Sequence, residues 1–234
     1  MPAITPVTAT HSAAPRASRA AAVLFAPIHK AIRLGLAEML VRIGQTAFGD
    51  DAAVGALFDE IESLFHKLER HAEVEDTVVA PALEGRAGEV FATHACLDRL
   101  TAELRALMVR ARTSRPDERE VIGRTLYLHF SRFVAEQLSH MAEEEQVLQP
   151  LLEWMHSDEE LFALHGAVLA RLSPEEKLAS APFMVWAAAP NERIALVRGF
   201  AAAAGPAVAA EVVKRAGTRL SPAELKELLE LAAR

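Results

Sequence analysis

The chain has 234 residues, 51% of them hydrophobic and 24% charged, enough to bury the core of one large domain or of one medium domain with an appendage. Its formal net charge of −7 disfavours a nucleic-acid partner, and no apolar run approaches the roughly 20 residues that span a membrane. A single cysteine excludes an internal disulfide framework and is typical of a reducing compartment, so we expect a cytoplasmic protein.

The composition and the first part of the chain predict helices. Few β-branched and aromatic residues stand beside abundant alanine, leucine, glutamate and arginine, which predicts an all-α fold. Residues 1–19 lack the apolar segment of a signal peptide, and we expect a disordered tail. Apolar residues then recur every three or four positions through residues 20–45 and 51–80, which predicts two helices. Asp50 offers the second helix an N-cap, and Pro81 marks its end.

Two further long helices complete the predicted bundle. The same periodicity runs through residues 88–112 and from about Asp117, a plausible N-cap, to about Leu148, with Pro150 after it. Four helices of this length with short connections predict an antiparallel up-down-up-down four-helix bundle over residues 20–155.

The remainder of the chain, residues 156–234, predicts a helical C-terminal extension. Its helices are shorter and rich in alanine, and they begin at capping signals such as Ser157-Asp-Glu-Glu160 and Ser221-Pro-Ala-Glu224. No chemistry is evident in this extension, which could form a subdomain or the interface of a homodimer.

An internal repeat links the two halves of the predicted bundle. The segment 71–84 recurs in register as segment 140–153, with His, Glu, an acidic residue, Val, Pro, Leu and Glu in the same places. In the same way, His29 on the first predicted helix matches His94 on the third. The first helix is therefore pseudo-equivalent to the third, and the second to the fourth.

The repeat carries two His-x-x-x-Glu pairs, His71 with Glu75 and His140 with Glu144. Residues four apart lie on one face of a helix, so each pair forms a clamp of one imidazole and one carboxylate. Nitrogen and oxygen donors together suit iron, zinc or manganese better than calcium or magnesium.

Helix lengths place the histidines of the other two helices near these clamps. Each helical residue advances about 1.5 Å along the axis. The number of residues from one of these histidines to the end of its helix nearly equals the number from the start of the next helix to the next histidine, so all four histidines can lie at one level of the bundle. Four histidines and two glutamates at one level are what a two-metal carboxylate site requires. The predicted metal ligands are His29, His71, Glu75, His94, His140 and Glu144.

These residues resemble the motif of the hemerythrin-like family, also called HHE cation-binding domains. The motif places a histidine on the first and third helices and His-x-x-x-Glu on the second and fourth, and the resemblance covers about residues 20–155. It implies a non-haem diiron centre, in which two oxo- or hydroxo-bridged iron ions share the glutamates. It also implies a protein that binds or senses a small ligand such as dioxygen, peroxide or nitric oxide, or that senses iron or redox state.

One departure and two other functions stay open. Asp98 stands where oxygen-carrying members have a second third-helix histidine, which disfavours reversible oxygen transport. It could be a further ligand, a partner that orients His94, or a solvated residue. The alternatives are a diiron enzyme of the peroxidase, nitric-oxide-handling or iron–sulfur-repair type, for which no catalytic residue can be named, and a metal-free helical interaction module.

The remaining polar residues have ordinary interpretations. We expect four histidines to lie outside the site, and a fifth, His165, could return towards it on a fifth helix; the four are His11, His66, His129 and His156. Glu73, Glu143 and Glu145 are expected to be solvated, although the last two flank the site. Cys96 is expected to be a small core residue.

Overall fold

A computed structural model describes the backbone of residues 19–233 and the side chains of residues 24–233. Every regular element in this range is a helix, which confirms the predicted all-α class. The tail expected at residues 1–19 lies outside the described residues except for Arg19, where the first helix begins.

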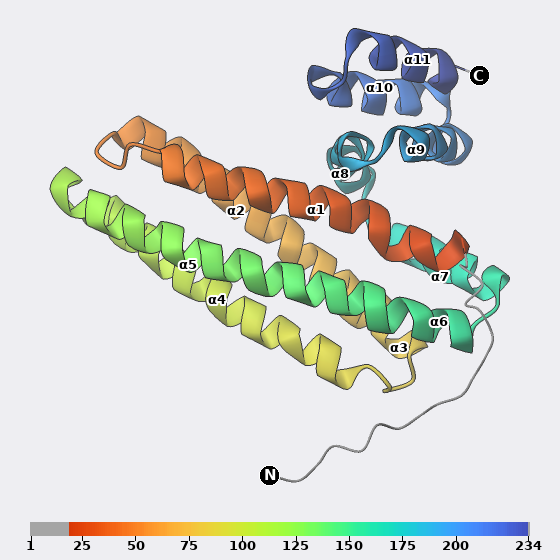
Figure 1. Cartoon of the computed structure of the whole chain (residues 1–234), viewed down its shortest axis with the longest axis horizontal. Helices are drawn as coiled ribbons and strands as arrows, with labels where there is room; N and C mark the ends of the chain where they lie inside the picture. The colour runs from red at the N-terminus through yellow and green to blue at the C-terminus, as the bar shows by residue number, and fades with distance from the viewer. Residues whose placement is uncertain (1–18, 234) are drawn as a thin grey trace, which may run out of the picture.

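Four long helices build the main body of the protein (Figure 1). They are α1 (Arg19–Gln45), α2 (Asp51–Val74), α4 (Gly88–Thr113) and α5 (Pro116–Glu143). Helix α1 packs on α2 and α5, and α4 packs on the same two helices, so the four surround one core. The largest fully buried side chains at the centre of that core include Leu36, Phe58, Phe65, Phe130 and Phe133.

Local signals at the helix starts differ slightly from the prediction. Asp50 caps α2 as expected, because its side chain accepts hydrogen bonds from the backbone N–H groups of Ala52 and Ala53. The N-cap of α5 is Arg115 and not Asp117, because Pro116 takes the first helical position. A proline there lacks only an N–H group that would be unsatisfied anyway, and its fixed φ suits the helix.

The second and fourth helices do not end at the prolines. Each passes into a π-helical turn, Glu75–Val79 and Glu144–Leu148, and then continues as α3 (Ala80–Ala82) or α6 (Gln149–Met155). The expected end near Leu148 is therefore wrong, since the helix runs on to Met155. A proline in a regular helix clashes with the carbonyl of the preceding turn, and the wider π turn ahead of each proline relieves that conflict.

The C-terminal extension contains α7 (Asp158–Ala170), α8 (Pro174–Ala187), α9 (Pro190–Ala204), α10 (Pro206–Ala216), a short 3₁₀ turn and α11 (Pro222–Ala232). Helix α7 packs on α1, and its Leu161 joins a core shared with the ends of the bundle helices. Helices α8–α11 bury a separate core of their own and lie against α1 through α8 (Figure 1).

Ion pairs join this α8–α11 unit to the long helices. They link Lys30 to Glu192 at 2.6 Å, Glu38 to Arg219 at 2.6 Å and Arg70 to Glu176 at 2.9 Å. Lys30 follows the predicted ligand His29 in the sequence, and Arg70 precedes the predicted ligand His71. None of the helices in the described part of the chain is both long and apolar enough to cross a bilayer.

Two glycines give a matched test of the packing. A Cβ atom at Gly123 on α5 would overlap the buried ring of Phe48, whereas a Cβ atom at Gly55 on α2 would meet nothing within 4 Å. We expect Gly123→Ala to lower the free energy of unfolding by about 1–3 kcal/mol through overpacking. Gly55→Ala should raise it by up to about 1 kcal/mol through helix propensity. Thermal and urea unfolding would measure both, and equal effects of the two variants would contradict the packing.

Candidate metal centre

The structure brings all six predicted ligands together inside the bundle. Five of them are buried: His29, Glu75, His94, His140 and Glu144 expose 6% of their surface or less. The sixth, His71, is the most accessible, with 19% of its side chain exposed. The two glutamates are the first residues of the two π turns, and the histidines come from α1, α2, α4 and α5.

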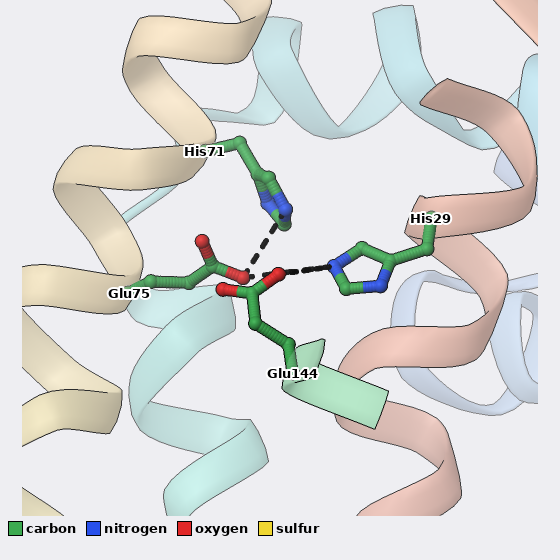
Figure 2. A group of neighbouring side chains, drawn as sticks. All are labelled: His29, His71, Glu75 and Glu144. Atoms are coloured by element: carbon green, nitrogen blue, oxygen red, sulfur yellow. Dashed lines mark ion pairs between the residues drawn. The ribbon is translucent and has the colours of Figure 1, made fainter. Parts of the chain in front are cut away.

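The six side chains form two overlapping groups, each able to hold a metal ion. One contains His29 and His71, and the other contains His94 and His140; both groups include Glu75 and Glu144. Within each group the ligand atoms lie within 4.8 Å of one another. Figure 2 shows the first group, with the imidazoles of His29 and His71 directed at the two carboxylates. Shared carboxylates are the arrangement by which one site holds two metal ions.

Unsatisfied polar atoms at the centre fit bound cations. Both carboxylate oxygens of Glu75 and of Glu144, and the Nε2 atoms of His29 and His71, are buried without a hydrogen-bond partner. Buried polar groups are almost always hydrogen-bonded in folded proteins, so such a cluster needs another partner. Mixed imidazole and carboxylate donors suit a first-row transition metal.

The distances between donors also fit metal coordination. The Nε2 atom of His71 lies 3.1 Å from Glu75 Oε1, and that of His140 lies 3.2 Å from Glu144 Oε1. The Nε2 atoms of His94 and His140 face each other at 2.8 Å. Neighbouring ligands of an octahedral ion with metal–nitrogen distances of about 2.1 Å are roughly 3 Å apart, so these atoms are spaced like adjacent ligands.

Without a metal, the buried charges shift the pKa values of the site. Burial would lower the pKa of His29, but contacts with Glu145 and Glu75 raise it to about 9. Burial, reinforced by the positive charge of His29, lowers the pKa of His71 to about 3. Burial and the neighbouring carboxylate of Glu144 raise the pKa of Glu75. The protons bound at the centre thus partly neutralise the negative charge of its two carboxylates.

Two further carboxylates hold the histidines of α1 and α4. The Nδ1 atom of His29 lies 2.9 Å from Glu145 Oε1, and the Nδ1 atom of His94 lies 2.8 Å from Asp76 Oδ1. The expectation that Glu145 is solvated is therefore wrong: it is 29% exposed and also accepts a hydrogen bond from Arg33 at 2.6 Å. The hydrogen bond from His29 lowers the pKa of Glu145 to about 2.

Sequence reasoning did not single out Asp76, although the signal was present. Asp76 and Glu145 occupy the same repeat position, one residue after each ligand glutamate. An acidic residue recurring beside a ligand in a repeat can be read as a partner for a neighbouring histidine.

A small cavity between α2, α4 and α5 reaches the ligands. His71, Glu75, His94 and His140 form one side of it, and the remaining lining residues are Leu68, Glu69, Ala72, Leu97, Asp98, Thr101 and Gln137. Asp98 is exposed and belongs to neither ligand group. Asp76 takes the role of orienting His94, which leaves Asp98 as a polar residue of the cavity.

The other histidines of the described chain lie outside both ligand groups. His66 and His129 are exposed, and His156 donates a hydrogen bond from Nε2 to the carbonyl of Ala82 at 2.9 Å. His165 is half-buried, and burial lowers its pKa. The interpretation of His11 concerns a residue outside the described range.

Comparisons with known proteins agree with this arrangement. The model of one family, the hemerythrin HHE cation binding domain, matches residues 24–152. Among curated proteins, F-box/LRR-repeat protein 5 of Xenopus tropicalis is 24% identical over 148 residues. The aligned region covers 63% of this chain but only 22% of that relative, so the similarity concerns a minor part of the larger protein. No solved structure gives a significant match.

The pKa of His29 predicts that metal binding releases protons. At pH 7 a group with a pKa of about 9 is protonated, and only the neutral imidazole can bind a metal. Binding of Zn²⁺ at the His29 group should release about one proton from this ring, and its affinity should rise up to about tenfold per pH unit between pH 7 and pH 9. Calorimetry in buffers of different ionisation enthalpy would count the protons, and His29→Gln should remove about one of them. An affinity independent of pH in this range would contradict the assignment.

Proposed function

The chain belongs to the family of hemerythrin HHE cation-binding domains, and from this premise we propose that the six predicted ligands hold two iron ions as a non-haem diiron centre. In this proposal, the centre binds or senses a small ligand such as dioxygen, peroxide or nitric oxide. The observation that carries it is the sharing of Glu75 and Glu144 by both ligand groups.

The donor set favours two ions over one. A single ion would leave half of the histidines unused, whereas two ions could engage the unpartnered carboxylate oxygens of Glu75 and Glu144 and the ligands of both groups. Each ion would have two imidazoles and two shared carboxylates, which leaves coordination positions open. An oxo or hydroxo bridge and an external ligand could fill these positions. A diiron centre of this kind supplies a place where a small oxygen or nitrogen ligand can bind and exchange electrons.

The cavity supports the small-ligand part of the proposal. It touches His71, His94 and His140 but is too confined for a large substrate. Thr101 and Gln137, both buried, add a hydroxyl and an amide to its wall. Hydrogen-bond donors beside open coordination positions could bind the outer atom of a diatomic ligand or of peroxide.

The proposal assumes an up-down-up-down bundle. Only residues 46–50 separate α1 from α2, and residues 114–115 separate α4 from α5. Connections this short favour antiparallel neighbours. In an antiparallel bundle, the histidines of the four helices can lie at one level along the bundle axis.

Glu75 allows a direct test of a shared centre. After growth with excess iron, the purified full-length chain should contain about two iron ions by mass spectrometry. Because Glu75 belongs to both groups, Glu75→Ala should remove most of both ions, whereas His29→Ala should affect mainly one of them. His66→Ala, an exposed change on the same helix, is the control that should keep the wild-type content. Less than about one iron ion in the wild-type chain would contradict the diiron proposal.

Thr101 tests whether the cavity is where the small ligand binds. Thr101→Leu removes a hydroxyl and adds bulk to the cavity without changing a ligand of either group. We expect unchanged iron content and at least about tenfold weaker binding of nitric oxide to the reduced protein, followed by visible absorption.

The same substitution at Thr113, exposed at the end of α4 and far from the cavity, should leave nitric oxide binding unchanged. Equal affinities of Thr101→Leu and Thr113→Leu would place the ligand elsewhere.

A further inference from the structure

We propose that Asp76 and Glu145 are positioning residues that hold His94 and His29 for metal binding, and that Arg33, bound to one of these acids, makes the two metal positions unequal in affinity. The inference rests on the proposed two-metal centre and concerns residues that do not themselves face a metal.

The two hydrogen bonds set which nitrogen of each ring is free. A neutral imidazole carries one N–H group, and a carboxylate at Nδ1 keeps the proton on that atom. The Nε2 atom is then the one left to bind a metal, and it faces inward: that of His29 lies 3.5 Å from Glu144 Oε2, and that of His94 lies 3.7 Å from Glu75 Oε2. His71 and His140 have no such hydrogen bond at Nδ1 in the described structure, so this support is specific to α1 and α4.

Both supports cross from one half of the repeat to the other. Asp76, from the first half, holds His94 of the second half, and Glu145, from the second half, holds His29 of the first. The two bonds are related by the same register that relates the ligands themselves. The match at equivalent positions argues for a common role, because accidental surface contacts would not recur on both sides of the centre.

Arg33 breaks this equivalence. Its Nη1 atom lies 2.6 Å from Glu145 Oε1, the same oxygen that accepts the bond from His29. The residue in register with Arg33 in the second half is Asp98, which carries the opposite charge. Asp76 therefore has His94 as its partner and no cation among the described residues.

The difference in charge predicts a difference in metal affinity. A carboxylate makes a histidine a stronger ligand, and loss of such a partner typically costs about 10–100-fold in metal affinity. Arg33 neutralises Glu145 and so weakens this effect at His29, while Asp76 keeps its full charge at His94. The position built by His94 and His140 should therefore bind its metal more tightly than the position built by His29 and His71.

Titration of the metal-free full-length chain with Co²⁺ tests this order. Cobalt is a suitable probe because its visible bands report coordination, and a competing chelator gives each binding constant. We expect two separable steps in the wild-type chain, of which His29→Ala should remove mainly the weaker one. Asp76→Ala should weaken the tighter step about 10–100-fold, and Asp76→Glu, which copies the other half of the repeat, should restore most of it.

Arg33→Gln should strengthen the weaker step and bring the two constants closer together. Arg42→Gln, which removes an exposed arginine of the same helix, and Asp59→Ala, which removes an exposed acid of α2, are matched controls that should change neither step. Circular dichroism of each metal-free variant separates a loss of binding from a loss of folding.

The outcomes separate this inference from the proposed function. Two wild-type steps that Asp76→Ala leaves within about twofold would overturn the positioning role but not the two-metal centre. Equal wild-type constants, or an unchanged weaker step in Arg33→Gln, would overturn the inequality. A wild-type chain that takes up no Co²⁺ would overturn both the inference and the proposed function.

Discussion

The burial of two carboxylates side by side in an apolar bundle is the constraint on which the rest of the structure depends. Glu75 exposes 4% of its surface and Glu144 none, and an uncompensated buried charge costs several kcal/mol. The protein meets this cost with four imidazoles, one from each long helix, that converge on the two acids. The bundle must therefore keep its four helices in register at this level, which the closed ring of helix contacts and the aromatic core below the site achieve.

The π turns explain how one short segment serves both the centre and its surroundings. Each turn begins at the ligand glutamate, and the next residue reaches a histidine on a neighbouring helix. The wider turn also changes the register of the helix, so that a buried aliphatic residue, Val79 or Leu148, and then a proline can follow. Single π turns of this kind occur frequently at functional sites, because they redirect side chains at a local cost in hydrogen bonding.

Much of the fold could be predicted from the sequence, because amphipathic periodicity is a strong local signal. The four long helices begin and end within a residue or two of their predicted bounds wherever glycine or an N-cap residue marks the boundary. The predicted helix end before Pro150 was wrong, because a proline ends a helix or not depending on the turn before it. No local propensity indicates a π turn. The position of α8–α11 could not be predicted either, since it depends on the packing of α8 on α1 and on ion pairs between residues more than 100 positions apart, such as Lys30 and Glu192.

The six residues of the candidate site could be found because each of them has an equivalent residue in the other half of the repeat. Glu145 was misjudged because a residue one step beyond an inward-facing ligand points sideways, and only the neighbouring helix decides whether it meets water or a histidine. That outcome depends on the packing of α1 against α5, which no spacing within a single helix contains.

The way the ligands are shared bears on how such a centre could arise. Each pair of helices supplies three ligands to one group and a single carboxylate to the other, so neither pair can complete a group alone. Two identical hairpins associated about a twofold axis would complete both groups, including the crossed hydrogen bonds of the acids that follow the glutamates. The bundle of this chain therefore has the form of two pseudo-equivalent helical hairpins within one polypeptide. One polypeptide allows the two hairpins to differ, and Arg33 in register with Asp98 is a difference that a dimer of identical hairpins could not have.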